Sequence, residues 1–352
     1  MLILGLETSC DETASCVLET QGESFLVRSN VVSSQVKLHA QWGGVVPNLA
    51  AREHLKNILP IINQSLKEAN IKPTNLDLIA VTNGPGLIPA LLIGTTTAKT
   101  LAYLWQKPLI GIHHIEGHIY ANFISEMAKK IRFPLLALVV SGGHTQLILM
   151  PKHLRYTIIG ETVDDAVGEA FDKVARILDL GYPGGPIVSK LADSYSGKKK
   201  FKISLPRPML KSPNFNFSFS GLKTAVLYAT KKEPQNLKNP VYIGEMCHEF
   251  QSAVLDVLVA KTLRAAKKYN PQTILLAGGV SANVALRQKM ALAIEQNFQE
   301  LVFLAPDLAY SMDNAAMIAT AGYFRWKNLK NRKTLEKNWQ TLKTDANLKL
   351  SF

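Results

Sequence analysis

Short hydrophobic runs and helical patterns follow one another in a regular order along the first third of the chain. Runs rich in aliphatic and β-branched residues predict strands, and apolar residues at helical spacing predict helices. The expected strands cover residues 2–6, 14–19, 25–34, 76–82 and 109–112, and the expected helices cover residues 48–69 and 87–105. Three strands followed by alternating helices and strands are typical of a mixed α/β unit.

A similar order begins again after residue 133. Strands are expected at residues 135–140, 145–150, 273–277 and 301–305, and helices at residues 161–180, 242–269, 284–294 and from residue 313. In each half, an apolar strand breaks into a small polar turn and then resumes as a strand. We therefore expect an α/β protein made of two duplicated halves that face each other across a cleft.

The boundaries follow from this duplication. We expect a first subdomain at residues 1–112, a histidine-bearing helix at the junction over residues 113–132, and a second subdomain at residues 133–325. An irregular insertion is expected within the second subdomain at about residues 194–240, and residues 326–352 read as a basic tail.

Two histidines at the junction carry the clearest chemical signal. On a helix, His114 and His118 lie one turn apart on the same face, so both imidazoles can bind one divalent metal ion. A polar helix surface that carries the two histidines by chance is the alternative. The zinc-protease motif is absent, because Ile115 rather than Glu follows His114.

Two glycine-rich turns are candidates for phosphate binding. Ser141, Gly142 and Gly143 follow an expected strand, and Gly278 and Gly279 lie between a strand and a helix. Backbone N–H groups at such turns form an anion nest, and the small side chains let a ligand approach. A tight hairpin with no ligand remains open for the first turn. A P-loop is excluded at residues 94–100, because Ala98 replaces the required glycine.

Composition narrows the setting. The chain has 352 residues and a formal net charge of +13, which favours a polyanionic partner such as nucleic acid. Three cysteines do not suggest a disulfide framework and favour a reducing compartment. The sequence shows neither a signal peptide nor an apolar run long enough to span a membrane. We expect a cytoplasmic protein with no membrane partner.

Ten motifs in a fixed order resemble a known family. They are LETSCDET, GGVVP, GPGL, HHIEGH, VSGGHT, GEAFDK, YPGGP, FSFSGLK, GGVSAN and DNAAMIA. The chain resembles the bacterial-type tRNA N6-adenosine threonylcarbamoyltransferases, once called O-sialoglycoprotein endopeptidases, over about residues 1–325. The resemblance implies the fold shared by actin-like ATPases, sugar kinases and Hsp70.

The resemblance also implies a reaction and its residues. The threonylcarbamoyl group of threonylcarbamoyl-AMP is transferred to N6 of adenosine 37 of tRNAs that read codons beginning with adenine, and AMP is released. The implied metal ligands are His114, His118 and Asp313, which hold one divalent ion, Fe²⁺ in preference to Zn²⁺. The implied substrate-binding residues are Val139, Val140, Ser141, Gly142, Gly143, Asp172, Gly185 and Asn283.

Other features of the site are less determined. Asp11 and Glu12 are candidates for orienting the incoming amine or accepting its proton, and the alternative is that they cap a turn. We expect Asp313 to come from the second half and to close the site across the cleft. This chain has Ser189 where some family members carry an acid, Gly181 where many have Asp, and Asn48 where many have Glu.

Partners follow from charge and from the resemblance. Candidate phosphate contacts for tRNA are Lys129, Lys130, Arg132, Lys198, Lys199 and Lys200, although each of these side chains can equally be solvated. The resemblance further implies an inactive paralogue of the same fold and a small P-loop-type ATPase. Two other functions stay open: a phosphotransferase or ATPase of this fold, and a binding protein without chemistry.

Overall fold

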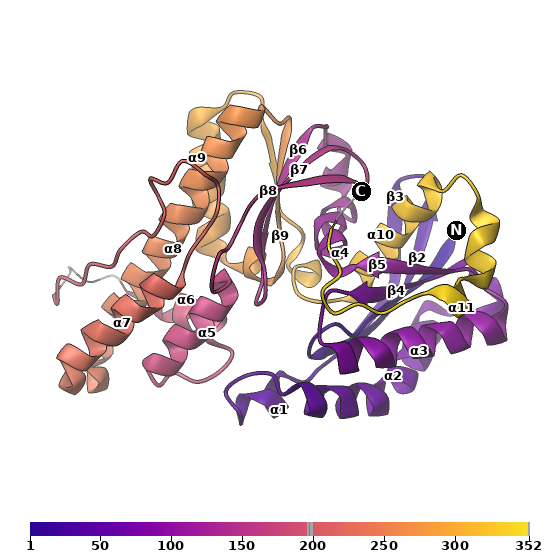
Figure 1. The fold of residues 1–352 in the computed structure, drawn as a ribbon, viewed down its shortest axis with the longest axis horizontal. Coiled ribbons are helices and arrows are strands. Elements are labelled where there is room, and N and C mark those ends of the chain that lie inside the picture. The colour runs from indigo at the N-terminus through magenta and orange to yellow at the C-terminus, as the bar shows by residue number, and fades with distance from the viewer. Residues whose placement is uncertain (196, 198–199, 351–352) are drawn as a thin grey trace. The chain divides into compact units, whose positions relative to one another are not determined.

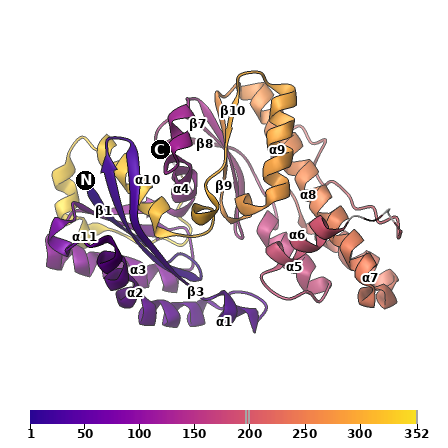
Figure 2. The same cartoon turned by 180° about the vertical axis from the view of Figure 1, so that it is seen from behind.

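The computed structural model describes residues 1–195, 197 and 200–350, and it divides into two compact units. The first unit contains Met1–Lys130, His153–Arg155 and the chain from Pro306 onward. The second contains Ile131–Lys152 and Tyr156–Ala305. Figures 1 and 2 show a β-sheet with flanking helices in each unit.

The sheet of the first unit has the strand order β3-β2-β1-β4-β5. Its strands are β1 (Leu2–Glu7), β2 (Glu12–Gln21), β3 (Ser24–Ser34), β4 (Leu78–Gly84) and β5 (Leu109–His113). Its helices are α1 (Val36–Ala40), α2 (Pro47–Ala69), α3 (Ile88–Trp105), α4 (His114–Tyr120), α10 (Ala315–Asn328) and α11 (Asn338–Thr341). The first three strands are antiparallel, and β4 and β5 continue the sheet in parallel with β1.

The sheet of the second unit has the order β10-β9-β6-β7-β8. Its strands are β6 (Leu135–Val140), β7 (Thr145–Lys152), β8 (Arg155–Glu161), β9 (Thr273–Ala277) and β10 (Val302–Leu304). Its helices are α5 (Val167–Ile177), α6 (Gly184–Ser194), α7 (Ser220–Lys232), α8 (Pro240–Tyr269) and α9 (Val284–Asn297). Strands β6 to β10 occupy the same positions in their sheet as β1 to β5 occupy in theirs, so the two sheets share a topology and the expected duplication is confirmed.

Alternation along β1 decides which residues face which helices. Leu4 and Leu6 belong to the core that α2 and α3 share, and those helices lie side by side on one face of the sheet (Figure 1). Side chains alternate along a strand, so Gly5 and Glu7 lie on the opposite face, where α4 and α10 pack. The second unit has a separate core beneath the long helix α8, which includes Leu138, Phe250 and Val254.

Three expectations for the second unit were wrong in detail. The helix expected at residues 161–180 covers only Val167–Ile177, because Glu161 is the last residue of β8 and residues 162–166 form a non-helical connection. The glycines after it begin α6 rather than a loop, with Gly184 packed closely against Ala175 and Asp172. The insertion at 194–240 contains the regular helix α7. Polar and glycine-rich composition hid these elements.

The chain from Pro306 onward corrects the expected boundaries. Residues 306–325 were expected in the second subdomain, but they belong to the first unit, where α10 packs on β1 and β2. The junction helix expected at 113–132 is helical only over α4 and continues as short 3₁₀ turns. Among the described residues, no helix is both long enough and apolar enough to cross a membrane.

Residues 338–350, which we call the strap, lie along the first unit instead of forming a free tail. The Trp339 ring packs on Tyr103, with ring centres 4.8 Å apart. The backbone N–H of Asp345 donates to the Asn83 carbonyl at 2.9 Å, and Gly86 N–H donates to the Ala346 carbonyl at 3.2 Å. The strap therefore covers the turn between β4 and α3.

Candidate active site

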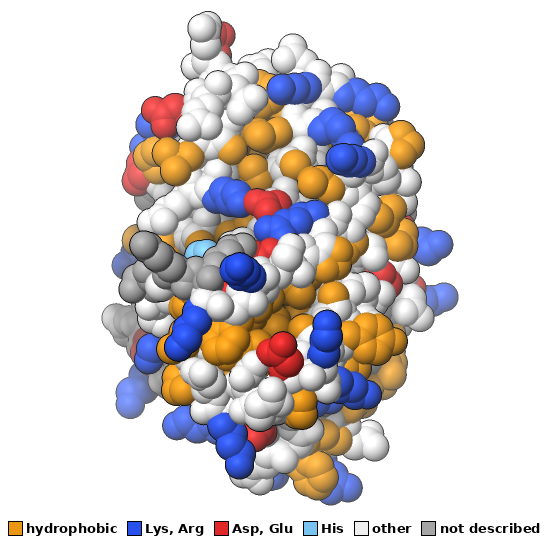
Figure 3. Space-filling view, turned by 90° about the vertical axis from the view of Figure 1, so that its left-hand side faces the viewer, with side chains coloured by type: hydrophobic (Ala, Val, Ile, Leu, Met, Phe, Trp, Pro, Cys, Tyr) orange, Lys and Arg blue, Asp and Glu red, His pale blue; other side chains and the backbone are white. Residues whose placement is uncertain are grey.

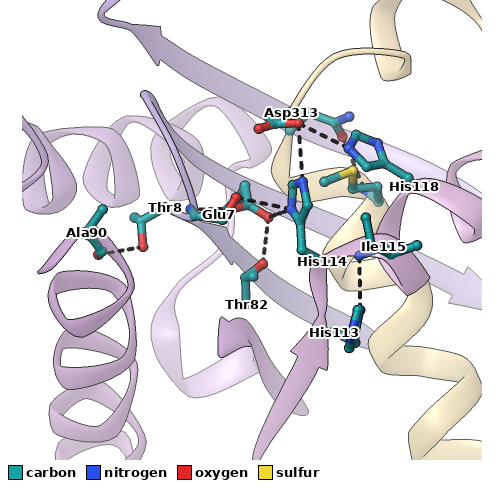
Figure 4. A network of polar contacts seen from close by, with 12 residues as sticks. Glu7, Thr8, Thr82, Ala90, His113, His114, Ile115, His118 and Asp313 are labelled. Carbon is teal, nitrogen blue, oxygen red and sulfur yellow. Dashed lines mark hydrogen bonds and ion pairs between the residues drawn. The ribbon is translucent and has the colours of Figure 1, made fainter. Parts of the chain in front are cut away.

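Three side chains of the first unit converge as a candidate metal site. His114 and His118 both project from α4, and Asp313 lies two residues before α10. One potential ligand atom from each residue can be chosen so that all three atoms lie within 4.8 Å of one another. Nε2 of His118 is 3.2 Å, and Nε2 of His114 3.6 Å, from Oδ1 of Asp313 (Figure 4). The expectation that Asp313 comes from the second half is wrong, because it belongs to the unit that holds the histidines.

Two glycines let the ligand-bearing helices approach each other and the sheet. A Cβ atom on Gly5 would lie 2.3 Å from the Ala315 carbonyl oxygen, so α10 begins in direct contact with β1. A Cβ on Gly117 would lie 2.7 Å from Ile318 Cδ1, so α4 and α10 are also closely packed. At the far end, the fully buried Glu116 accepts two hydrogen bonds from Arg325. These contacts fix Asp313 next to the histidine pair.

The burial and hydrogen bonding of His118 also fit a metal ion, apart from the distances between the three side chains. His118 is 1% exposed, and among the described residues neither ring nitrogen makes a well-formed hydrogen bond, although Nε2 lies 3.2 Å from Oδ1 of Asp313. A buried polar atom without a partner is costly, and an ion held between the two imidazoles and the carboxylate would satisfy it. Two histidines and one carboxylate form the ligand set typical of non-haem Fe²⁺, and Zn²⁺ accepts the same atoms.

The neighbouring carboxylates set the charge of His114 in the metal-free protein. Burial alone would lower its pKa, but the negative charges of Asp313 and Glu7 outweigh burial and raise the pKa to about 9. Burial lowers the pKa of His118, and the adjacent His114 acts in the same direction. The two ligands therefore differ in how strongly they hold a proton.

Asp11 and Glu12 lie where β2 begins, and both are nearly buried. Burial raises the pKa of Glu12 to about 10, and the charges of Asp313 and Asp11 add to the effect. Ser34 donates a hydrogen bond to Glu12 at 3.1 Å. At neutral pH, Glu12 is thus a neutral acid in the metal-free protein.

In the second unit, several turns converge at the end of β6. The turn Ser141–Gly143 follows Val139 and Val140 directly, and its two glycines have open space where a side chain would be. A Cβ on Gly168, in the first turn of α5, would lie 2.8 Å from the Ser141 carbonyl oxygen. Gly278 has a φ of 86° and packs against Val140, where a Cβ would lie 2.4 Å from the carbonyl oxygen. Backbone thus surrounds an open, glycine-lined turn.

The other expected substrate residues also lie in the second unit. Asp172 accepts a hydrogen bond from Gly184 N–H at 2.7 Å and so orders the turn that contains Gly185, whose Cβ position is open. Asn283 caps α9 by accepting from Leu286 N–H, and its amide group donates to Ser189 and Gln251, both at 2.9 Å. The structure gives Ser189 a role as acceptor for Asn283.

Of the expected tRNA contacts, Lys198 and Lys199 lie outside the described residues. Lys130 and Arg132 are exposed, and Lys129 forms an ion pair with Glu126. Lys200 is exposed, and its backbone N–H donates to Glu245.

Sequence reasoning missed the residues that support the metal ligands. Glu7 is fully buried and contacts His114, and Thr82 and Ser9 in turn contact Glu7. The available signal was a single acidic residue at the end of an otherwise apolar strand, on the face opposite Leu4 and Leu6.

Comparison with solved structures defines the class of fold. HypF from T. kodakarensis matches with a TM-score of 0.58 at 12% identity, covering 95% of this chain and 49% of that one. The activator of the 2-hydroxyisocaproyl-CoA dehydratase from Clostridium difficile matches with a TM-score of 0.52 at 11% identity, covering 94% and 99%. With its two duplicated sheets, the chain has an α/β fold of the actin-like ATPase type.

Sequence comparison then defines the family. The model of the tRNA N6-adenosine threonylcarbamoyltransferase family matches residues 26–320. Enzymes with this description from Persephonella marina and Bacillus subtilis (strain 168) are 50% and 48% identical, over 93% and 92% of this chain and 91% and 90% of theirs. The chain belongs to this family and is a transferase that forms N6-threonylcarbamoyladenosine in tRNA.

Proposed function

We propose that this chain transfers the threonylcarbamoyl group from threonylcarbamoyl-AMP to N6 of adenosine 37 in tRNAs that read codons beginning with adenine, and releases AMP. The observation that carries the proposal is the cluster of the buried His114 and His118 with the partly buried Asp313 in a chain of this family. A transferase with an activated acyl donor needs mainly to orient the amine and stabilise developing charge.

The proposed cofactor is one divalent metal ion per chain, Fe²⁺ in preference to Zn²⁺, held by His114, His118 and Asp313. The close approach of the buried His118 imidazole to Asp313, without a well-formed hydrogen bond, and the ligand set support it. When bound, the ion supplies a Lewis acid for anionic oxygens of the donor. Metal analysis of anaerobically purified protein tests the choice: iron near one equivalent supports it, and zinc alone contradicts it.

The proposed donor site lies in the second unit. The phosphate of the AMP portion would accept hydrogen bonds from the backbone N–H groups of Gly142 and Gly143. Val139, Val140 and Ser141 would line the site before them, and the backbone N–H of Ser141 already donates to the His144 carbonyl at 2.8 Å. The absence of any atom near the Cβ positions of Gly142, Gly143 and Gly185 supports this assignment, because a ligand needs that space. Asp172 and Asn283 would hold the nucleoside, with their neighbouring turns already ordered by Gly184 and Leu286.

Asp11 and Glu12 are the proposed acid–base residues. Glu12 has a pKa raised to about 10, so its neutral carboxyl suits a hydrogen-bond donor that orients a reacting group. Asp11 is the proposed acceptor for the proton that N6 loses when the new carbamoyl bond forms. Asp11→Asn should lower kcat about 100-fold with little change in KM for the donor. A change confined to KM would assign Asp11 to binding.

Several features support the proposed partners. Lys and Arg side chains spread over the face that carries α7 and α8, as Figure 3 shows, and this suits a tRNA acceptor. Lys129, Lys130, Arg132 and Lys200 are the proposed phosphate contacts within the described residues. The paired helices α2 and α3 expose Leu55, Leu59 and Leu92, a surface that suits an inactive paralogue of the same fold. A small P-loop-type ATPase as second partner and a cytoplasmic location are proposed from the family and its tRNA substrate.

The decisive experiment is a modification assay. Unmodified tRNA is incubated with threonylcarbamoyl-AMP, this chain and the proposed partners, and the digested nucleosides are analysed by mass spectrometry. Threonylcarbamoyladenosine should form, and His118→Ala should abolish it, while His248→Gln, a histidine of the second unit, should not. No product with intact donor and bound metal would contradict the proposal.

A further inference from the structure

The end of strand β1 places a carboxylate against the back of one metal-ligating imidazole. Oε2 of Glu7 lies 3.1 Å from Nδ1 of His114, and Glu7 is fully buried (Figure 4). A buried carboxylate at this distance accepts a hydrogen bond, so Nδ1 of His114 carries a hydrogen atom. Nε2, the nitrogen on the side of Asp313, is then the atom that can offer a lone pair to a metal ion once the ring is neutral.

The Glu7 carboxylate is itself held on both oxygens. Oε1 accepts from Ser9 N–H at 2.5 Å, and Oε2 accepts from the Thr82 hydroxyl at 2.6 Å. These donors come from the turn after β1 and from β4, so the orientation of Glu7 does not depend on the histidine. Both oxygens already accept hydrogen bonds, and Oε2 faces Nδ1 of His114 rather than Nε2, which argues against Glu7 as a direct metal ligand.

The second imidazole has no comparable support. Nδ1 of His118 has no hydrogen-bond partner among the described residues, whereas Nδ1 of His114 lies between Glu7 and the Ser9 hydroxyl. The two ligands are therefore unequal, and only His114 is fixed in ring orientation before the metal binds, with Nδ1 turned toward Glu7.

We propose that Glu7 is a positioning residue that fixes His114 as an Nε2 ligand through a carboxylate–histidine–metal triad. This inference rests on the proposed metal site and adds to it a residue that binds neither metal nor substrate. Loss of a carboxylate that hydrogen-bonds to a metal-ligating histidine typically weakens metal binding about 10–100-fold.

The test measures metal binding rather than activity. Zn²⁺ affinity is determined by competition with a chelator for the wild type, Glu7→Gln and Glu7→Asp. In Glu7→Gln, the amide NH₂ must face either Ser9 N–H, where two donors meet, or His114. If it faces His114, it donates to Nδ1, so the hydrogen atom of the neutral ring moves to Nε2 and blocks metal binding there. In Glu7→Asp, the charge remains but the shorter side chain withdraws from Nδ1. Both variants should bind Zn²⁺ at least tenfold more weakly.

Glu245→Gln is the matched control, because Glu245 is also a buried carboxylate that accepts several hydrogen bonds, but it lies in the second unit. It should leave Zn²⁺ affinity within about threefold, since it cannot act on His114. Folded Glu7 variants with wild-type affinity would overturn the inference.

A second measurement needs no substitution. Long-range ¹H–¹⁵N NMR spectra of the Zn²⁺-loaded wild type should show His114 with a protonated Nδ1 and a metal-bound Nε2. Metal on Nδ1 would overturn the role of Glu7 while leaving the metal site intact. A wild type that binds no Zn²⁺ and no Fe²⁺ would overturn the metal site as well.

Discussion

At the residue scale, a proton and a metal ion compete for His114. In the metal-free protein, burial opposes protonation, but the charges of Asp313 and Glu7 raise the pKa of His114 to about 9. Metal binding requires the neutral imidazole, so the ion must displace this proton over most of the neutral range.

This competition predicts the pH dependence of metal binding. Below about pH 9, apparent Zn²⁺ affinity should fall about tenfold for each unit of pH, because one proton is displaced. The slope should steepen only in acid, because the pKa of His118 is lowered from 6.5. Chelator competition between about pH 7 and 8.5 measures this slope. A flat affinity over that interval would rule out proton displacement from His114.

The same proton links pH to folding stability. Because the folded-state pKa of His114 is raised above its ordinary value of 6.5, its contribution to the stability of the metal-free protein is fully present below that value. The contribution is lost as pH rises through about 9.

Residues that touch the metal were easier to predict than those that support it. His114 and His118 show their helical spacing in the sequence, and Asp313 entered only through the resemblance to a family. Glu7 shows only an acidic residue at the end of an apolar strand, and nothing local points to its partner His114, which is more than 100 residues away in sequence. Tertiary hydrogen bonds of this kind leave no periodic trace.

At the element scale, close helix packing sets the position of Asp313. Gly5 allows the start of α10 to touch β1, and any side chain there meets the Ala315 backbone rather than a movable side chain. Gly5→Ala should therefore displace the start of α10, destabilise the protein by about 1–3 kcal/mol and weaken Zn²⁺ binding at least tenfold. Denaturant unfolding and chelator competition measure the two effects.

Gly221 provides the control for Gly5. It lies in α7 with open space at its Cβ position, so Gly221→Ala should be neutral or stabilise the protein by up to about 1 kcal/mol. Equal losses of metal affinity in the two variants would show that α10 packing does not set the site.

The buried pair of Glu116 and Arg325 predicts a second effect on these helices. Glu116→Gln leaves the Arg325 charge without its buried partner and should destabilise the protein by about 3 kcal/mol. The double variant Glu116→Gln/Arg325→Met should recover part of that loss. Thermal unfolding of the three proteins measures it, and a single variant as stable as wild type would contradict the prediction.

Long periodic elements were predicted well, and short polar ones were not. The helices α2 and α8 have apolar residues at helical spacing, and α3 is a long apolar run, whereas α6 begins at paired glycines. Gly184 is helical because its missing side chain lets α6 pack against α5, a contact that local propensity does not encode.

At the scale of the whole molecule, the first unit is built from distant parts of the chain. Charge and composition suggested a basic tail after residue 325, but Leu335 and Leu350 are buried, and the strap hydrogen-bonds to β4 residues and to His113. His113 Nε2 lies 3.0 Å from the Leu348 carbonyl oxygen, and the His113 ring caps α4 through Ile115 N–H. Charged residues between these anchors disguised them.

Removal of the strap should therefore affect the two units differently. A chain shortened to residues 1–330 should bind Zn²⁺ more weakly, because His113, which caps α4, loses its contact with the Leu348 carbonyl. Its affinity for AMP should not change, because the proposed AMP site lies in the second unit. Trp339→Ala should weaken Zn²⁺ binding less than the truncation does, and it should lower the free energy of unfolding by about 2 kcal/mol. Isothermal titration with each ligand measures the difference. Parallel losses of both affinities would contradict it.

The discontinuity of the first unit also orders events during synthesis on the ribosome. His114 and His118 emerge early, but Asp313, α10 and the strap emerge only after the second unit has been made. A nascent chain therefore carries two of the three proposed metal ligands for most of its translation and acquires the third late. Chains that stop early present the two histidines without the Asp313 carboxylate, so the proposed metal ion would distinguish finished molecules from incomplete ones.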